Sequence, residues 1–185
     1  MKMFDYREDA KEFIRSSLSL YLRNAFNEEE CVPFTKVCNV ISRYNTVHRS
    51  SLKVSAGFAR VAIIGYGWVI KLDQRISCVG NCQEEVIAYE MIKRNGFSYL
   101  FAEPTSFFYQ GHTYYIYPKI ENIDPKRTMS DLYDALDEEE SEFLDDYFND
   151  LHGGNFGFDI LGNPVIIDYA SNWLSEQEES SYFES

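Results

Sequence analysis

The chain has 185 residues, 45% hydrophobic and 16% aromatic, which suffices for one domain or two small lobes and excludes an intrinsically disordered chain. Its formal net charge of −13 repels phosphate backbones, so we expect no direct binding to nucleic acid. The opening MKMFDYREDAKEF lacks an apolar stretch, and no run approaches the ~20 apolar residues that span a bilayer, so we expect neither a signal peptide nor a membrane partner.

The cysteines and histidines show no metal-binding spacing. No two cysteines form a C-x-x-C pair, and the histidines are scattered, which argues against a zinc site. A chain with this much core material does not need disulfides, so a reducing cytoplasm is the simpler expectation. The residues concerned are Cys31, Cys38, Cys78, Cys82, His48, His112 and His152.

Two helices are predicted in residues 1–50. Apolar residues recur at helical spacing from about Asp9 to Phe26, and Pro33 can open a second helix whose inner face includes Val37 and Ile41. We interpret residues 1–50 as an N-terminal helical extension that packs on a sheet, in preference to a partner-binding segment.

The pattern changes near Ser51 to that of an antiparallel sheet. The stretches LKVS, ARVAIIG and WVIKLD read as three short strands, and NCQEEVIAYEMIKRNG reads as a helix that Asn81 caps and Gly96 stops. A hairpin follows, with SFFY and TYYIY joined at Gln110-Gly111 and ended by Pro118. Residues 51–118 are therefore predicted to form a first lobe, with one helix inserted among five strands.

The remaining chain is predicted to be helical and acidic before it reaches a glycine-rich loop. The inner face of a helix that includes Phe143 and Leu144 leads into the loop from Asp150 to Asn155. The short strands FGFD and PVIID come next, joined by Leu161-Gly162-Asn163. We assign residues 119–175 to a reduced second lobe and 176–185 to an acidic tail.

Three polar residues in this second lobe suggest a magnesium site. Asn155 follows Asp150 by five positions, and Asp168 ends the apolar strand Val165-Ile166-Ile167. Burying an unpaired carboxylate is costly, and a metal ion would compensate the charge. Magnesium takes one or two protein oxygens and fills its other positions with phosphate and water, so Asn155 and Asp168 are the predicted metal ligands.

These segments resemble the motifs of protein kinases, whose catalytic loop reads H-R-D-x-x-x-x-N and whose metal motif reads D-F-G. The chain has Phe148-Asn149-Asp150 through Asn155, and later Asp168-Tyr169-Ala170. The resemblance implies an α+β, minimal two-lobed protein-kinase-like fold with an antiparallel N-lobe sheet and a C-helix. It also implies that the chain binds ATP and Mg²⁺.

A lysine and a glutamate fit the same resemblance. Val69-Ile70-Lys71 is similar to the kinase V-A-I-K, and strand alternation predicts that Lys71, flanked by Ile70 and Leu72, points inward. The alternative is an ordinary lysine exposed on a strand. The helix that follows carries Glu84 and Glu85. Glu85 shares a stripe with Tyr89 and Ile92 and is the preferred lysine partner, with Glu84 as the alternative.

The nucleotide-covering parts are assigned by position. Gly57-Phe58-Ala59 lies between the first two strands and resembles the end of the kinase glycine-rich loop, with Val61 returning under the adenine. We expect adenine to lie against the segment from Tyr117 through Lys119 to Ile120, whose backbone groups can pair with its edge.

The same motifs are similar to those of the early serine/threonine kinases of lytic tailed bacteriophages. The likeness rests on Gly57-Phe58-Ala59, Val69-Ile70-Lys71, Phe148 to Asn155, and Asp168 to Ser171. It implies phosphorylation of host proteins in the host cytoplasm during infection. In such an enzyme Lys71 holds the α- and β-phosphates, and Asp150 takes the proton of the acceptor hydroxyl. His152 either contacts the γ-phosphate or bonds to its own loop.

Several departures keep other functions open. No His-Arg precedes Asp150, Ala170 replaces the glycine of D-F-G, and only 17 residues follow Asp168, too few for a full activation segment. Recognition of a substrate would then fall to the N-terminal helices, to a homodimer partner, or to the target's own surface. The alternatives are a catalytically dead kinase-like protein that binds and inhibits a host protein, and an acidic mimic of nucleic acid.

Overall fold

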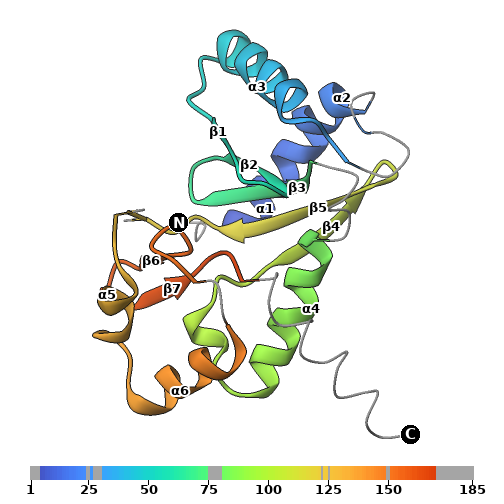
Figure 1. Cartoon of the computed structure of the whole chain (residues 1–185). Helices are drawn as coiled ribbons and strands as arrows, with labels where there is room; N and C mark the ends of the chain where they lie inside the picture. The colour runs from blue at the N-terminus through green and yellow to red at the C-terminus, as the bar shows by residue number, and fades with distance from the viewer. Residues whose placement is uncertain are drawn as a thin grey trace, which may run out of the picture. The chain divides into compact units, whose positions relative to one another are not determined.

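The computed structural model describes residues 5–23, 26, 31–74, 81–121, 123–124, 126–148 and 151–169 (Figure 1). The predicted α+β class is confirmed, because helices accompany a five-stranded antiparallel sheet and a separate two-stranded sheet. The predicted acidic tail at 176–185 lies outside the described residues, as do Cys78, Asp150, Ala170 and Ser171. Within the described ranges, no helix is long and apolar enough to cross a membrane.

The chain forms two compact units. Unit 1 comprises Met1–Gln83 and Pro104–Lys119, and unit 2 comprises Glu84–Glu103 and Ile120–Ser185. Residues 84–103, which the sequence predicts in the first lobe, thus group with the C-terminal part. The units also differ in charge, since 13 of the 17 Lys and Arg residues belong to unit 1, whereas 22 of the 30 acidic residues belong to unit 2.

Unit 1 is built around the five-stranded sheet, in the order β1-β2-β3-β5-β4. The element order of strand, strand, strand, helix, strand, strand agrees with the kinase-like N-lobe expected from the sequence. The strands are β1 (Lys53–Ala56), β2 (Arg60–Ile64), β3 (Trp68–Asp73), β4 (Thr105–Tyr109) and β5 (His112–Pro118).

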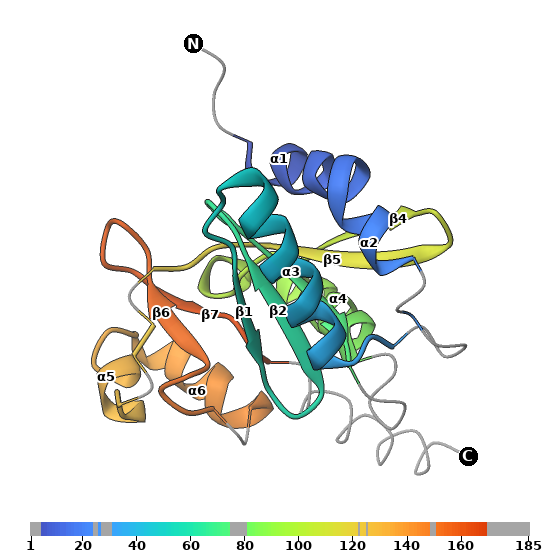
Figure 2. The same ribbon diagram turned by 90° about the horizontal axis from the view of Figure 1, so that it is seen from above.

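The N-terminal helices cover one face of this sheet, as predicted (Figure 2). The first helical run is longer than expected at its start, because Asp5 caps it by accepting a hydrogen bond from the Arg7 N–H at 3.0 Å. The run consists of α1 (Tyr6–Phe13), a π-helical turn (Ile14–Leu18) and α2 (Ser19–Leu22), and α3 (Phe34–His48) follows Pro33. Alternate residues of β2, β3 and β5 point into the core beneath these helices, among them Val61, Ile63, Ile70, Leu72 and Ile116.

Unit 2 has an aromatic core of its own. Helix α4 (Asn81–Arg94) contributes Tyr89 and Ile92 to it, and Gly96 ends the helical stretch with a φ of 93°. The other elements are a 3₁₀ turn (Ser98–Leu100), α5 (Met129–Tyr133), α6 (Glu138–Tyr147), β6 (Phe156–Phe158) and β7 (Pro164–Ile166). Capping boxes start α5 at Thr128 and α6 at Asp137.

Candidate nucleotide and metal site

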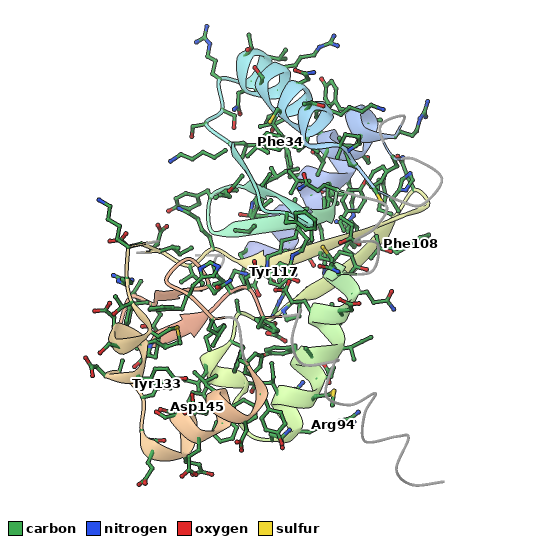
Figure 3. All side chains as sticks on the ribbon, in the orientation of Figure 1. Phe34, Arg94, Phe108, Tyr117, Tyr133 and Asp145 are labelled. Atoms are coloured by element: carbon green, nitrogen blue, oxygen red, sulfur yellow. The ribbon has the colours of Figure 1, made fainter. Side chains whose placement is uncertain are left out.

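Lys71 lies on the face of the sheet opposite to the N-terminal helices. Its neighbours Ile70 and Leu72 are buried in the core beneath those helices, so strand alternation turns Lys71 to the other side. The Lys71 Nζ atom lies 4.4 Å from the ring centroid of Tyr117, which is labelled in Figure 3. This cation–π contact holds a half-buried ammonium group on that face, where a phosphate ligand would find a positive charge.

The loop Gly57-Phe58-Ala59 is fixed to the end of β3. The side-chain Nε2 of Gln74 donates to the carbonyl oxygens of Gly57 at 2.5 Å and Phe58 at 2.9 Å, and the Gln74 N–H donates to the Ala59 oxygen at 3.0 Å. Phe58 stands at the tip of the loop with 71% of its surface exposed. The predicted loop therefore lies near the strand that carries Lys71, and Gln74 holds it there, a role that no sequence pattern indicates.

The expectation for Val61 was wrong. Val61 pairs with Leu72 across β2 and β3 and is fully buried beneath the N-terminal helices, so it lies on the face opposite to Lys71. The residue that pairs with Lys71 is Ala62, and this smaller side chain shares the lysine's face.

The predicted adenine segment divides between the units. Tyr117 is almost fully buried at the end of β5, and the Lys119 N–H donates to the Gly67 oxygen at 3.1 Å. This N–H is therefore already paired within unit 1. Ile120 belongs to unit 2. It packs closely on Gly157 there, because a Cβ atom added to Gly157 would lie 2.8 Å from the Cγ2 atom of Ile120.

Asn155 and Asp168 come to the same end of the β6–β7 hairpin. The register pairs Phe156 with Ile166, and the Ile167 N–H donates to the Asn155 oxygen at 2.7 Å, so Asp168 lies one residue beyond that bond. The strand–turn–strand predicted between these residues is confirmed. The hairpin turn is fixed by Asp159, whose pKa is lowered by hydrogen bonds from the Asn163 side chain and from backbone N–H groups.

The residues at this hairpin end suit a magnesium ion. Asn155 offers an amide oxygen that accepts one bond, from the His152 N–H at 2.9 Å, and an amide oxygen has two lone pairs. Asp168 adds a carboxylate, and oxygen donors of this kind are what Mg²⁺ prefers. Across the described ranges no three His, Cys, Asp or Glu side chains gather as a metal cluster.

The loop before Asn155 is closely packed. A Cβ atom added to Gly153 would lie 2.1 Å from the backbone oxygen of Arg127, so only glycine fits there without a shift. The exposed His152 ring accepts a hydrogen bond from the Gly154 N–H at its Nδ1 atom, at 3.1 Å. The second of the two roles considered for His152, a bond to its own loop, is thus present, and Nε2 is the nitrogen that would face a ligand.

Glu85 is fully buried and bonded to the residue that follows Asp168. It shares the buried side of α4 with Tyr89 and Ile92, as the periodicity predicted, whereas Glu84 is half-exposed. The Tyr169 N–H donates to Glu85 Oε1 at 3.3 Å, and the Tyr169 hydroxyl donates to the Ala102 oxygen at 3.0 Å. Tyr169 thereby fixes the backbone next to Asp168, a role that its place in the D-F-G-like motif could have suggested.

Each unit therefore brings together only some of the predicted site residues. Unit 1 brings Lys71 and Tyr117 together and holds the loop at residues 57–59 near the end of β3. Unit 2 brings His152, Asn155 and Asp168 to one loop and hairpin end, with Glu85 bonded to the residue after Asp168. The predicted base, Asp150, lies outside the described residues.

Comparisons with known proteins give a weak likeness to solved structures. No protein-family model matches the chain, and no curated protein matches it. The chain is 14% identical to WbdD over 72% of this chain and 36% of that one, with a TM-score of 0.39. It is 18% identical to APH(2")-IIa in a complex with streptomycin and ATP, over 57% and 35% of the two chains, with a TM-score of 0.32.

A second WbdD structure, with the kinase inhibitor LY294002, is 16% identical over 69% of this chain and 35% of that one, with a TM-score of 0.29. The chain spans about a third of the length of the structures it matches. At these values the function has to be inferred from the chain's own residues.

Proposed function

We propose that the chain is an ATP- and magnesium-dependent phosphotransferase. The observation that carries the proposal is the joint placement of Asn155 and Asp168 at one hairpin end, with the adjoining Tyr169 N–H bonded to the buried Glu85. A carboxylate and an amide oxygen held in this way are suited to a divalent ion that carries a triphosphate.

Each residue has a distinct role in this proposal. Lys71 holds the α- and β-phosphates, and Glu85 is the partner proposed to orient it. Asn155 and Asp168 would hold Mg²⁺, which neutralises charge on the β- and γ-phosphates. Asp150 orients the acceptor hydroxyl and takes its proton, and Nε2 of His152 can donate to a γ-phosphate oxygen.

The finer proposal is a serine/threonine kinase of bacteriophage origin that acts on host proteins in the host cytoplasm. It is supported by the motif likeness from Gly57 to Ser171. Substrates would be proteins, with neither nucleic acid nor membrane as a direct partner.

A second candidate is a catalytically dead kinase-like protein that binds and inhibits a host protein. Two departures favour it, since Phe148-Asn149 stands where the kinase loop has His-Arg, and Ala170 stands where the kinase D-F-G has glycine. Such a protein could bind ATP without transferring phosphate.

The test is transfer of labelled γ-phosphate from ATP into bacterial lysate proteins, with the wild type and Asp168→Ala compared under matched conditions. We expect incorporation with the wild type and near-complete loss in the variant, because removing one metal ligand removes most of the electrostatic stabilisation. A folded wild type that binds ATP with magnesium but labels nothing would favour the second candidate. Equal labelling by the variant would reject the site.

A further inference from the structure

A groove in unit 1 lies between α3 and β1, on the face of the sheet opposite to Lys71. It has a volume of about 460 Å³. Its helical side consists of residues spaced three or four positions apart, and Phe34 continues that stripe towards the start of α3, with 38% of its surface exposed (Figure 3). The lining residues are Cys38, Ile41, Ser42, Asn45, Thr46, Leu52 and Val54.

The outer edge of β1 borders this groove and is only partly covered. Asn45 satisfies the backbone groups of Leu52, just before β1. Its Nδ2 donates to the Leu52 oxygen at 2.8 Å, and its Oδ1 accepts from the Leu52 N–H at 3.1 Å. The side-chain amide thus bonds to Leu52 in the way that a neighbouring strand would. It also holds α3 and the start of β1 together, so the groove is already formed.

The next positions along the edge are open. The Gly57 N–H donates to the Arg60 oxygen, and by the alternation of an antiparallel ladder Ser55 and Lys53 also bond towards β2. The N–H and C=O groups of Val54 and Ala56 therefore point away from β2. Among the described residues none bonds to these groups, and β1 is the last strand on its side of the sheet.

The two sides of this edge differ in chemistry. Val54 points into the groove, whereas Lys53 and Ser55 lie on the opposite face. Side chains of a strand added beside β1 would alternate in the same way, with one set against Ile41, Leu52 and Val54 and the other set beside Lys53.

The charge around the groove has a single sign. No Asp or Glu occurs between Cys31 and Leu72, and this stretch carries six Lys and Arg residues. Arg49 at the C-cap of α3 and Lys53 on β1 are exposed beside the groove, whereas Arg43 lies over the Tyr21 ring, on the side of α2. The net charge of the whole chain therefore does not describe this region, which favours an acidic partner.

We propose that the β1 edge and the α3–β1 groove together bind an extended segment of a partner protein in which acidic and apolar residues alternate. The main chain of the segment pairs with Val54 and Ala56, its apolar side chains occupy the groove, and its acidic side chains lie beside the basic residues. This binding site does not depend on phosphate transfer and can be tested without ATP.

The test uses fluorescence anisotropy of the full chain with a short, end-blocked, dye-labelled peptide in which Glu and Val alternate. We expect saturable binding, and at least about tenfold weaker binding of a Lys–Val peptide of equal length. A fully N-methylated Glu–Val peptide, which cannot donate to a strand edge, should lose affinity to a similar extent. Equal binding of either comparison peptide, or no saturable binding of the Glu–Val peptide, would overturn the proposal.

Two matched variants locate the site on the chain. Ser42→Trp fills the groove from an exposed helical position and should weaken binding of the Glu–Val peptide about tenfold or more. Val47→Trp places the same side chain at another exposed position of α3, outside the groove lining, and should leave binding unchanged. Binding that Ser42→Trp leaves intact, or displacement of the peptide by a single-stranded oligonucleotide, would show that the groove is not a peptide site.

Discussion

The backbone N–H of Tyr169 donates to Oε1 of Glu85 at 3.3 Å, which links the start of α4 to the residue that follows Asp168. Glu85 is fully buried, and a buried carboxylate is tolerated when hydrogen bonds satisfy it. Within unit 2 this bond therefore couples the proposed lysine partner to the position of the proposed metal ligand.

Glu85→Ala should destabilise the fold, because it removes the acceptor of a buried N–H. The expected loss is about 1–3 kcal/mol in the free energy of unfolding, measured by urea denaturation. Glu85→Gln keeps an acceptor oxygen and should lose less. Glu84→Ala, at the half-exposed neighbouring position, is the matched control, and a loss there as large as in Glu85→Ala would contradict the role assigned to Glu85.

Gly153→Ala should also destabilise the protein, for a steric reason. Its new Cβ atom would lie 2.1 Å from the Arg127 backbone oxygen, so either the loop or residue 127 must move, at a cost of about 1–3 kcal/mol. In the control Gly154→Ala, the nearest atom is in the His152 side chain at 3.0 Å, which can rotate away. Equal unfolding midpoints for the two variants would show that the loop tolerates the contact.

Asp159 should make the β6–β7 hairpin sensitive to acid. Hydrogen bonds from the Asn163 side chain and from backbone N–H groups lower its pKa below the ordinary value of 3.8. A lowered carboxyl pKa in the folded state gives stability that is fully present above pH 3.8 and is lost as the pH falls through the folded-state pKa.

Asp159→Asn removes this titration, so thermal unfolding of the two proteins should differ most at neutral pH. The difference should shrink well below pH 3.8, where the wild-type carboxyl is protonated. A difference in melting temperature that stays constant across this range would mean that the charge of Asp159 does not stabilise the turn.

Much of the sheet was predictable because buried and less buried residues alternate along its strands and because turn residues mark the strand ends. Ile70 and Leu72 are buried and Lys71 is not, the predicted helix begins at Asn81, and the hairpin turn lies at Gln110-Gly111 as its turn residues predict. Local signals of this kind act within one element and can be read from the sequence.

The face of Val61 was not predictable in the same way. The β2 sequence RVAII offers apolar residues at successive positions, so either phase would bury some of them, and a change of one position exchanges the two faces. Only the register with β3 decides it, by pairing Val61 with Leu72. The bonds from Gln74 to the loop are likewise tertiary, and residue spacing carries no signal for them.

We propose that Lys71 and Asp168 act on the same ATP–magnesium complex, and calorimetric titration tests this proposal directly. ATP affinity would be measured with and without Mg²⁺ for the wild type, Lys71→Ala and Asp168→Ala. We predict that each variant binds about tenfold or more weakly with Mg²⁺, and that only Asp168→Ala loses the enhancement by the metal. Wild-type affinity in Lys71→Ala, or wild-type magnesium dependence in Asp168→Ala, would contradict the claim.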